Sequence, residues 1–178
     1  MTEIVTPRLT LRHARPDDLE ALHAVLSDAR ATRWWSTPPH ASREETRRWL
    51  DSMLAGNASG APDFVIERDG RVIGKAGFYR LPEVGYILHP DHWGLGLATE
   101  AVGAAVAHVF ATTDLDDLSA DVDPENQASI RLLQKLGFVV TGSAERTWNI
   151  AGEWKNSLYY GLTRRAWTAH ANGSSSGS

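Results

Sequence analysis

The stretch Glu83–Ala101 constrains the fold more than any other part of the sequence; it reads EVGYILHPDHWGLGLATEA. Its first part, Val84–Leu88, is apolar and rich in strand-forming residues, and it stops before a proline, which is typical of a strand. Ala98–Thr112 then carries apolar residues at helical spacing. Because Gly94 and Gly96 lie between these two segments, the stretch predicts a strand, a glycine-bearing turn and the N-terminus of a helix.

A turn of this kind can bind an anion. The first four amides of a helix have no partner inside the helix, and the helix dipole places partial positive charge there. Glycines at positions 94 and 96 carry no Cβ, so that a phosphate can approach the bare backbone. A pair of glycines is weak evidence alone, and a plain tight turn that leads into a helix is the alternative interpretation.

The remaining patterns give the order of the other elements. Strands are expected at residues 8–13, 63–68, 71–79 and 115–122, from 138 onward, and at 154–162; helices are expected at 17–27, 42–54 and 126–136. Asp69-Gly70 is a hairpin signal, and Ser42-Arg43-Glu44-Glu45 is a capping box. The order β-α-α-β-β-β-α-β-α-β-β predicts an α/β (mixed α+β) fold. Its central, mostly antiparallel mixed sheet has about seven strands flanked by helices.

Length and composition narrow the class of protein. The 178 residues suit one domain, expected at residues 1–168, and the Gly/Ser-rich residues 169–178 are expected to form a disordered tail. A net charge of -4 gives no general attraction to nucleic acid or to a membrane surface. No cysteine is present, which excludes thiolate nucleophiles, disulfides and cysteine zinc sites. The sequence also lacks a long apolar run and a basic, apolar leader, so we expect a cytoplasmic protein.

Four segments carry a family resemblance. They are TPRLTLR at 6–12, GYIL through WGLGLATEA at 85–101, NQAS through LGF at 126–138, and GEWKNSLYY at 152–160. In this order and spacing they resemble the GNAT acyltransferase superfamily, and within it the RimJ/RimL-like N-acetyltransferase branch. The resemblance covers roughly residues 7–167 and implies the GNAT fold, with acetyl-CoA as acyl donor.

The resemblance also implies a coenzyme site. It places the pyrophosphate on the backbone amides of Trp93, Gly94, Leu95, Gly96, Leu97, Ala98 and Thr99, although the superfamily usually has Arg or Gln where Trp93 stands. It places the pantetheine arm between the strand holding Tyr86, Ile87 and Leu88 and the strand holding Ala120 and Val122. Asn126 would bond that arm, or cap the helix that follows it. Lys135, four residues after Arg131, would meet a CoA phosphate, or both would lie on a solvated helix face.

The chemistry of amine acetylation assigns further roles. The amine must lose a proton, the oxyanion needs a donor, and the departing thiolate needs a proton. Without a cysteine to carry the acyl group, direct attack on the thioester is favoured. Glu83 matches the acid before Gly-Tyr in many relatives, which makes it the candidate general base; a solvated carboxylate at a strand end is the alternative. Many GNAT enzymes carry a catalytic Tyr where this chain has Leu133. Ser129, four residues earlier and expected on the same helix face, is therefore the candidate donor to the thiolate, or a locally bonded helix residue.

The resemblance implies a primary amine as the acceptor, either a protein or peptide N-terminus or a small molecule. In this family Trp34, Trp35 and Trp148 would flank the acceptor cleft, although tryptophans are as often core residues. His89, Asp91 and His92 are interpreted as loop residues, so no metal is expected. The alternatives are another acyl donor such as succinyl-CoA, or a module that binds CoA without turnover. We expect acetyl-CoA and an amine as partners of a monomer or homodimer, without nucleic acid or membrane.

Overall fold

One sheet organises the molecule. The computed structural model describes residues 2–174. Its strands follow the order β1-β2-β3-β4-β5-β6-β8-β7. The strands are β1 (Glu3–Val5), β2 (Thr10–Arg12), β3 (Asp63–Arg68), β4 (Arg71–Arg80), β5 (Glu83–Leu88), β6 (Asp117–Val122), β7 (Val139–Ile150) and β8 (Glu153–Thr163). The helices are α1 (Leu19–Leu26), α2 (Arg43–Ala58), α3 (Leu97–Thr112), α4 (Gln127–Lys135) and α5 (Arg164–Ser174), with short 3₁₀ turns at Pro16–Asp18 and Pro90–His92.

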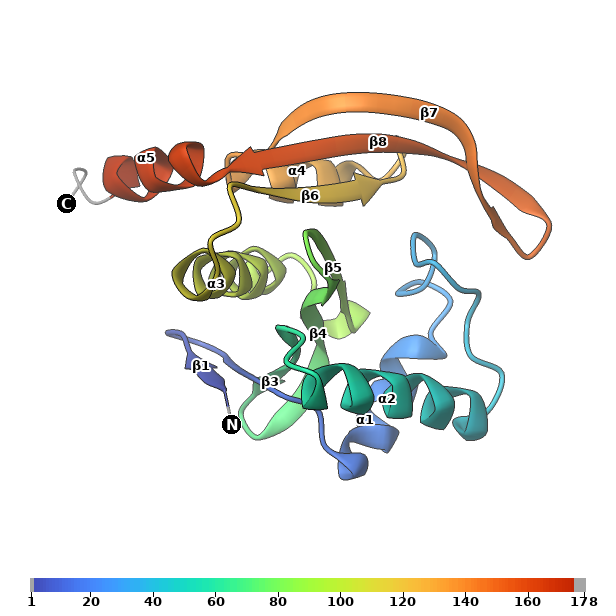
Figure 1. The fold of residues 1–178 in the computed structure, drawn as a ribbon. Coiled ribbons are helices and arrows are strands. Elements are labelled where there is room, and N and C mark those ends of the chain that lie inside the picture. The colour runs from blue at the N-terminus through green and yellow to red at the C-terminus, as the bar shows by residue number, and fades with distance from the viewer. Residues whose placement is uncertain (1, 175–178) are drawn as a thin grey trace.

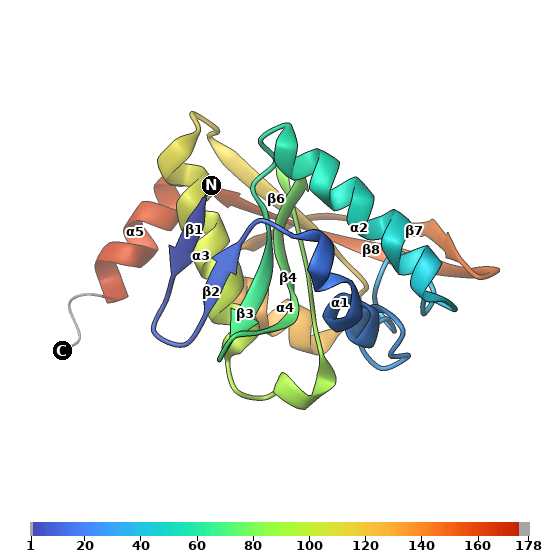
Figure 2. The same ribbon diagram turned by 90° about the horizontal axis from the view of Figure 1, so that it is seen from below.

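Helices cover both faces of this sheet (Figures 1 and 2). Leu22 of α1 and Leu50 of α2 pack with Val65 on one face of β3. On the opposite face α3 and α4 close the main core with β4, β5, β6 and β8. The two faces of the central strands are therefore lined by different helices, and side chains that alternate along a strand enter different environments.

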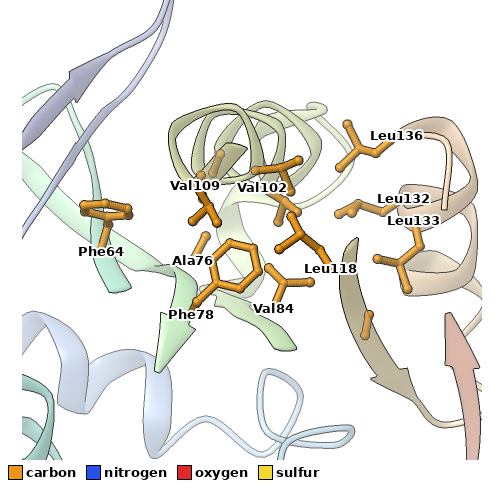
Figure 3. Packing of buried hydrophobic residues seen from close by; sticks show 14 of the residues in the cluster. Phe64, Ala76, Phe78, Val84, Val102, Val109, Leu118, Leu132, Leu133 and Leu136 are labelled. Atoms are coloured by element: carbon orange, nitrogen blue, oxygen red, sulfur yellow. The ribbon is translucent and has the colours of Figure 1, made fainter. Parts of the chain in front are cut away.

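Figure 3 shows the main core at close range. Val102 and Val109 of α3 point toward Phe78 of β4, and all three are fully buried. Leu132 and Leu133 of α4 approach the same cluster from the side of β6. Each large apolar side chain buried in this way stabilises the fold by roughly 1.5–3 kcal/mol, so this core holds α3 and α4 firmly against the strands.

The two strands at the centre of the sheet are parallel and touch at one end. β5 pairs with β6 only through Glu83 and Ser119, and the Ser119 amide also donates to the Pro82 carbonyl (3.0 Å). β4 on one side and β8 on the other continue their antiparallel ladders along the rest of these strands. Parallel neighbours need a crossover connection, which α3 supplies. Beyond Glu83 the two strands separate, and this separation creates the cavity described below.

The structure confirms the predicted fold class and most of its local signals. Asp69 (φ 51°) and Gly70 (φ 75°) form the predicted hairpin turn between β3 and β4. Ser42 caps α2, because its side chain accepts from the Glu45 amide at 3.2 Å. The described sheet has eight strands where about seven were expected, since Glu3–Val5 adds β1 beside β2. No helix within residues 2–174 is long and apolar enough to cross a membrane.

The C-terminal segment differs from its prediction. Residues 169–174 were expected to be disordered, yet α5 continues through them to Ser174; residues 175–178 of the predicted tail lie outside the described residues. Two side chains near the start of the helix anchor it. The Arg164 guanidinium donates to the carbonyls of Phe110, Thr113 and Leu115 at 2.6–3.1 Å, and Trp167 packs beside Phe110 with ring centroids 6.4 Å apart. With its first turns fixed, the helix can extend into a segment of weak helix-forming sequence.

Candidate active site

A cavity of about 1000 Å³ lies where β5 and β6 separate. Its walls come from β5, the turn before α3, the first turn of α3, β6 and the first turns of α4. The loop before α2, the α2 helix and the β7–β8 hairpin extend it on the other side. One end of the cavity therefore meets a helix N-terminus, and the other is lined by aromatic side chains.

The turn before α3 exposes backbone donors to this cavity. Gly94 (φ 72°) and Gly96 (φ 73°) occupy the left-handed region, where residues with a Cβ are strained. Gly96 is the N-cap of α3, and the first intrahelical bond runs from the Glu100 amide to the Gly96 carbonyl (3.1 Å). The amides of residues 97–99 precede that bond, and these three residues line the cavity. They form a positive helix terminus that suits a phosphate group.

The N-terminal segment holds this turn from behind. Arg8 donates through Nη1 to the Leu95 carbonyl (2.7 Å) and through Nε to Glu100 Oε2 (2.6 Å). Glu100 Oε1 accepts from the Arg8 amide (3.0 Å) and from the Thr6 hydroxyl (2.6 Å). Burial would raise the pKa of Glu100, but the hydrogen bonds from Thr6 and Arg8 outweigh it and lower the pKa overall. These contacts give the TPRL segment a structural role, which the sequence alone did not assign.

Alternate side chains of β5 enter the two faces of the sheet. Val84 and Leu88 are buried in the core with α3, and Tyr86 packs against the same cluster. Ile87 instead packs with Val25 and Leu26 of α1. Because side chains alternate along a strand, Glu83 shares the face of Ile87, on the side of α1 and α2. Glu83 and Tyr86 therefore approach the cavity from opposite faces of the sheet.

Glu83 lies at the junction of β5 and β6 and lines the cavity. Its carboxylate is exposed, yet the cavity walls take part of its surroundings out of water, and this desolvation raises its pKa above the ordinary value. Repulsion from the Asp121 carboxylate on β6 raises the pKa further. A carboxylate with a raised pKa is a stronger base, which suits the predicted role.

Tyr86 and Ser129 meet across the cavity. Their hydroxyl groups form a short hydrogen bond, and both residues line the cavity. Burial raises the pKa of Tyr86 to about 12, although the bond with Ser129 acts in the opposite direction. Asn126 caps α4 by accepting from the Ser129 amide (3.2 Å) and also lines the cavity. The helix-cap interpretation of Asn126 is thereby confirmed, and its contact with a pantetheine arm stays a prediction.

The spacing predicted that Leu133 shares the cavity face of α4 with Ser129, but Leu133 does not lie on that face. Leu133 is fully buried among the α3 and α4 side chains (Figure 3), whereas Leu132 is the neighbouring residue that lines the cavity. Residues four apart on a helix are offset by about 40°, and here the apolar contact of Leu133 with the core decides the orientation. A tyrosine at position 133 would enter the core.

The predicted site residues divide into those that line the cavity and those that do not. Those that line the cavity are Glu83, Tyr86, Ile87, Leu88, Trp93, Gly94, Gly96, Leu97, Ala98, Thr99, Asn126, Ser129, Trp34, Trp35 and Trp148. Leu95 and Lys135 are not among the lining residues: the Leu95 carbonyl binds Arg8, and Lys135 is exposed in the last turn of α4. Arg131, one turn before Lys135, does line it.

The far end of the cavity contains charges that the sequence did not reveal. Lys75 of β4 and Asp63 of β3 form a buried ion pair (2.5 Å) on the cavity wall. The Lys75 ammonium also lies over the Trp35 ring, 5.9 Å from its centroid, and the Arg33 guanidinium lies 4.7 Å from the centroid of Trp34. A lysine inside the apolar strand segment 72–78 was the available signal, because lysine is rarely fully buried unless it is paired.

Within residues 2–174, no three His, Asp or Glu side chains are grouped so that they could hold a metal ion. His89 and Asp91 approach at 3.7 Å in the loop after β5. Trp93, at the start of the turn, uses its indole Nε1 to donate to the Leu88 carbonyl (2.9 Å). This bond ties the turn to the end of β5, which gives Trp93 a structural role in the place of the family's usual Arg or Gln.

These features define a transferase of the GNAT class: central parallel strands that part around a cavity, with a glycine-bearing helix N-terminus at one end. A family model described as "Acetyltransferase (GNAT) domain" matches residues 8–139. The chain belongs to the GNAT acetyltransferase family and is an N-acetyltransferase, and membership implies acetyl-CoA as the acyl donor.

Relatives and solved structures agree with this assignment. An uncharacterized N-acetyltransferase p20 of Bacillus licheniformis is 34% identical over 152 residues, covering 80% of this chain and 85% of the relative. Spermidine N(1)-acetyltransferase of Escherichia coli K12 is 30% identical over 157 residues, covering 83% and 82%. The structure of a GNAT acetyltransferase from Bacillus anthracis superposes with a TM-score of 0.80 at 24% identity, covering 92% and 99%. RimL, the ribosomal L7/L12 alpha-N-protein acetyltransferase in complex with coenzyme A, gives a TM-score of 0.79 at 21% identity, covering 93% and 99%. At these identities the structures establish the fold alone.

Proposed function

We propose that the enzyme transfers the acetyl group of acetyl-CoA to a primary amine by direct attack of the amine on the thioester. One observation supports this most strongly: the first turn of α3, where helix amides lack intrahelical partners, lines the cavity between the separated β5 and β6 strands. A pyrophosphate on those amides would leave the pantetheine arm to extend along the separated strands. Arg131, one turn before Lys135, is the cation on α4 that lines this cavity.

We assign the two substrates to opposite faces of β5. Glu83 lies on the face covered by α1 and α2, which we propose as the amine side, and it acts there as the general base. Ser129 reaches the cavity from α4, on the side that we propose for the thioester sulfur. The amine nitrogen forms the new bond to the acetyl carbon, the carbon–sulfur bond breaks, and its electron pair leaves with sulfur. The proton of the amine passes to Glu83, directly or through water.

We favour a peptide α-amino group over a polyamine as the acceptor. The names of the relatives leave both classes open, because one is a spermidine acetyltransferase and another acts on a ribosomal protein. A polyamine would gain from free aromatic faces, but the cations of Arg33 and Lys75 already lie over Trp34 and Trp35. At pH 7, deprotonation of an α-amino group costs only about 1 kcal/mol, against about 4.6 kcal/mol for a lysine-like amine, so a carboxylate base suffices for the former.

A thiol-release assay tests the proposal. Acetyl-CoA and succinyl-CoA are each offered with short peptides that have free N-termini, with the same peptides blocked at the N-terminus, and with spermidine. We expect turnover with acetyl-CoA and the free peptides. Turnover with spermidine alone would overturn the acceptor class, and a preference for succinyl-CoA would overturn the donor. Tight CoA binding without any turnover would identify a binding module instead.

Cytoplasmic localisation and a monomeric or homodimeric state stay predictions from the sequence. Light scattering coupled to size-exclusion chromatography would measure the oligomeric state directly. Neither nucleic acid nor a membrane is part of the proposed reaction.

A further inference from the structure

The hydrogen bond between Tyr86 and Ser129 joins two walls of the cavity that otherwise diverge. Tyr86 projects from β5, and Ser129 projects from the first turn of α4. Ser129 is held at both its ends: its amide donates to Asn126 and its hydroxyl meets the phenol. The phenol in turn packs against the main core. Few rotamers are therefore open to either hydroxyl, and the pair is oriented before any substrate binds.

The position of Ser129 matters because α4 lacks the tyrosine acid that is usual in the family. Leu133 occupies the position of that tyrosine in the sequence, and its side chain is buried in the core. A serine hydroxyl has one hydrogen to donate. If it donates to a departing sulfur, its oxygen has lone pairs free to accept a hydrogen bond from a second donor. Tyr86 is the group in that place.

We propose that Tyr86 is a positioning residue whose hydroxyl donates to Ser129 and directs the Ser129 hydrogen toward the sulfur of acetyl-CoA as the carbon–sulfur bond breaks. This inference rests on the proposed function. The amine nitrogen bonds to the acetyl carbon, and the sulfur takes the electron pair of the broken bond. Ser129 donates a hydrogen bond to that thiolate, and the phenol donates one to Ser129. Neither residue loses its proton, and the thiolate is protonated afterwards from solvent.

The acidity of the phenol supports a hydrogen bond instead of a proton transfer. The pKa of Tyr86 is raised to about 12, whereas that of an alkyl thiol is about 8.5. Moving the phenolic proton to the thiolate would be unfavourable by about three powers of ten, so the phenol stays protonated across the working pH range. A chain of two hydroxyls can still polarise toward a developing charge, since each bond strengthens the next.

A double-mutant cycle tests the pair. Tyr86→Phe and Ser129→Ala each remove one hydroxyl, and Tyr159→Phe removes a phenolic hydroxyl from β8 at a position that does not line the cavity. We expect each single variant of the pair to lower kcat about 10- to 100-fold, as for hydrogen bonds to charged groups. The KM for acetyl-CoA should change less than about threefold. The double variant should lose little more than Ser129→Ala, because Tyr86 acts through Ser129.

Two readouts separate this role from a structural one. The ratio of wild-type to Tyr86→Phe kcat should be constant from pH 6 to 9, because no proton leaves the phenol; a ratio that changes through this range would overturn the hydrogen-bond form of the proposal. Additive losses, a wild-type kcat in Tyr86→Phe, or an effect confined to KM would each overturn the pairing. If Tyr86→Phe fails to fold, a wild-type kcat in Ser129→Ala is sufficient to overturn it. Wild-type enzyme that binds CoA but acetylates no acceptor would overturn the proposed function itself, a result visible before any variant is made.

Discussion

Replacing Arg8 with alanine should weaken acetyl-CoA binding and leave the chemical step intact. Arg8 holds the turn from the side away from the cavity, through the Leu95 carbonyl and the Glu100 carboxylate. Its guanidinium also neutralises Glu100, which sits in the first turn of α3 beside the amides proposed to bind pyrophosphate. The substitution therefore loosens the turn and leaves an uncompensated negative charge near a site for an anion.

The size of the expected loss in acetyl-CoA affinity follows from the solvent exposure of the two side chains. The side chain of Arg8 is 46% exposed and that of Glu100 is 15% exposed, so solvent screening limits the contribution of the ion pair to about 1 kcal/mol. Repulsion between the freed carboxylate and the pyrophosphate adds about 0.5–1 kcal/mol at a helix terminus. Together these give roughly 1.5–2 kcal/mol, which is about a 10- to 30-fold increase in the Kd for acetyl-CoA.

Isothermal titration calorimetry with CoA measures this change, and steady-state assays should show a higher KM with kcat nearly unchanged. The double variant Arg8→Ala with Glu100→Gln should bind more tightly than Arg8→Ala alone, because the repelling charge is gone. Arg71→Ala, at an exposed position of the β3–β4 hairpin, is the matched control. A Kd unchanged in Arg8→Ala, or no recovery in the double variant, would refute the electrostatic reasoning.

Four further predictions address other parts of the site and core. Gly94→Asp should weaken CoA binding at least tenfold by calorimetry, because a charge enters the anion site and a Cβ is forced into the left-handed region at φ 72°, a strain of about 1–2 kcal/mol. Glu83→Gln should lower turnover most at low and neutral pH. Asp121→Asn should move the acidic limb of the kcat/KM profile to lower pH, since the Asp121 charge helps to raise the pKa of Glu83 and its removal lets Glu83 ionise earlier; a limb shifted upward would contradict this. Leu133→Ala should destabilise the fold by about 2–5 kcal/mol in urea titration, because its side chain is fully buried, and should leave the CoA affinity of the folded protein unchanged.

The sequence predicted best those features that a few adjacent residues determine. The strand, the glycine turn and the helix of 83–112 are adjacent in the chain, and their backbone angles follow from Gly94, Gly96 and the apolar spacing of α3. The Asp69-Gly70 turn is equally local. The strand Glu3–Val5 was missed because three residues carry too little pattern, and its formation depends on pairing with β2.

Contacts between distant segments were harder to predict. The orientation of α4 could not be read from the spacing of Ser129 and Leu133, because a neighbouring helix and strand decide which of them faces the core. Lys75 and Asp63 are twelve residues apart, on strands whose register carries an irregularity between Ile66 and Glu67. Their ion pair exists only once β3 and β4 are aligned, so no local signal could place it in the cavity.

The difference between local signals and contacts of distant segments explains why the coenzyme end of the site is better defined by the sequence than the acceptor end. Backbone amides form the proposed pyrophosphate site, and any sequence that builds the turn and the start of α3 supplies them. Side chains from four separate segments form the proposed acceptor wall: Trp35 before α2, Asp63 on β3, Lys75 on β4 and Trp148 on β7. Trp148 is held there by its bond to Asp121 (2.9 Å), the carboxylate that also raises the pKa of Glu83. A substitution in the β7–β8 hairpin can therefore change both the acceptor wall and the acidity of the proposed base, and these two properties need not vary independently.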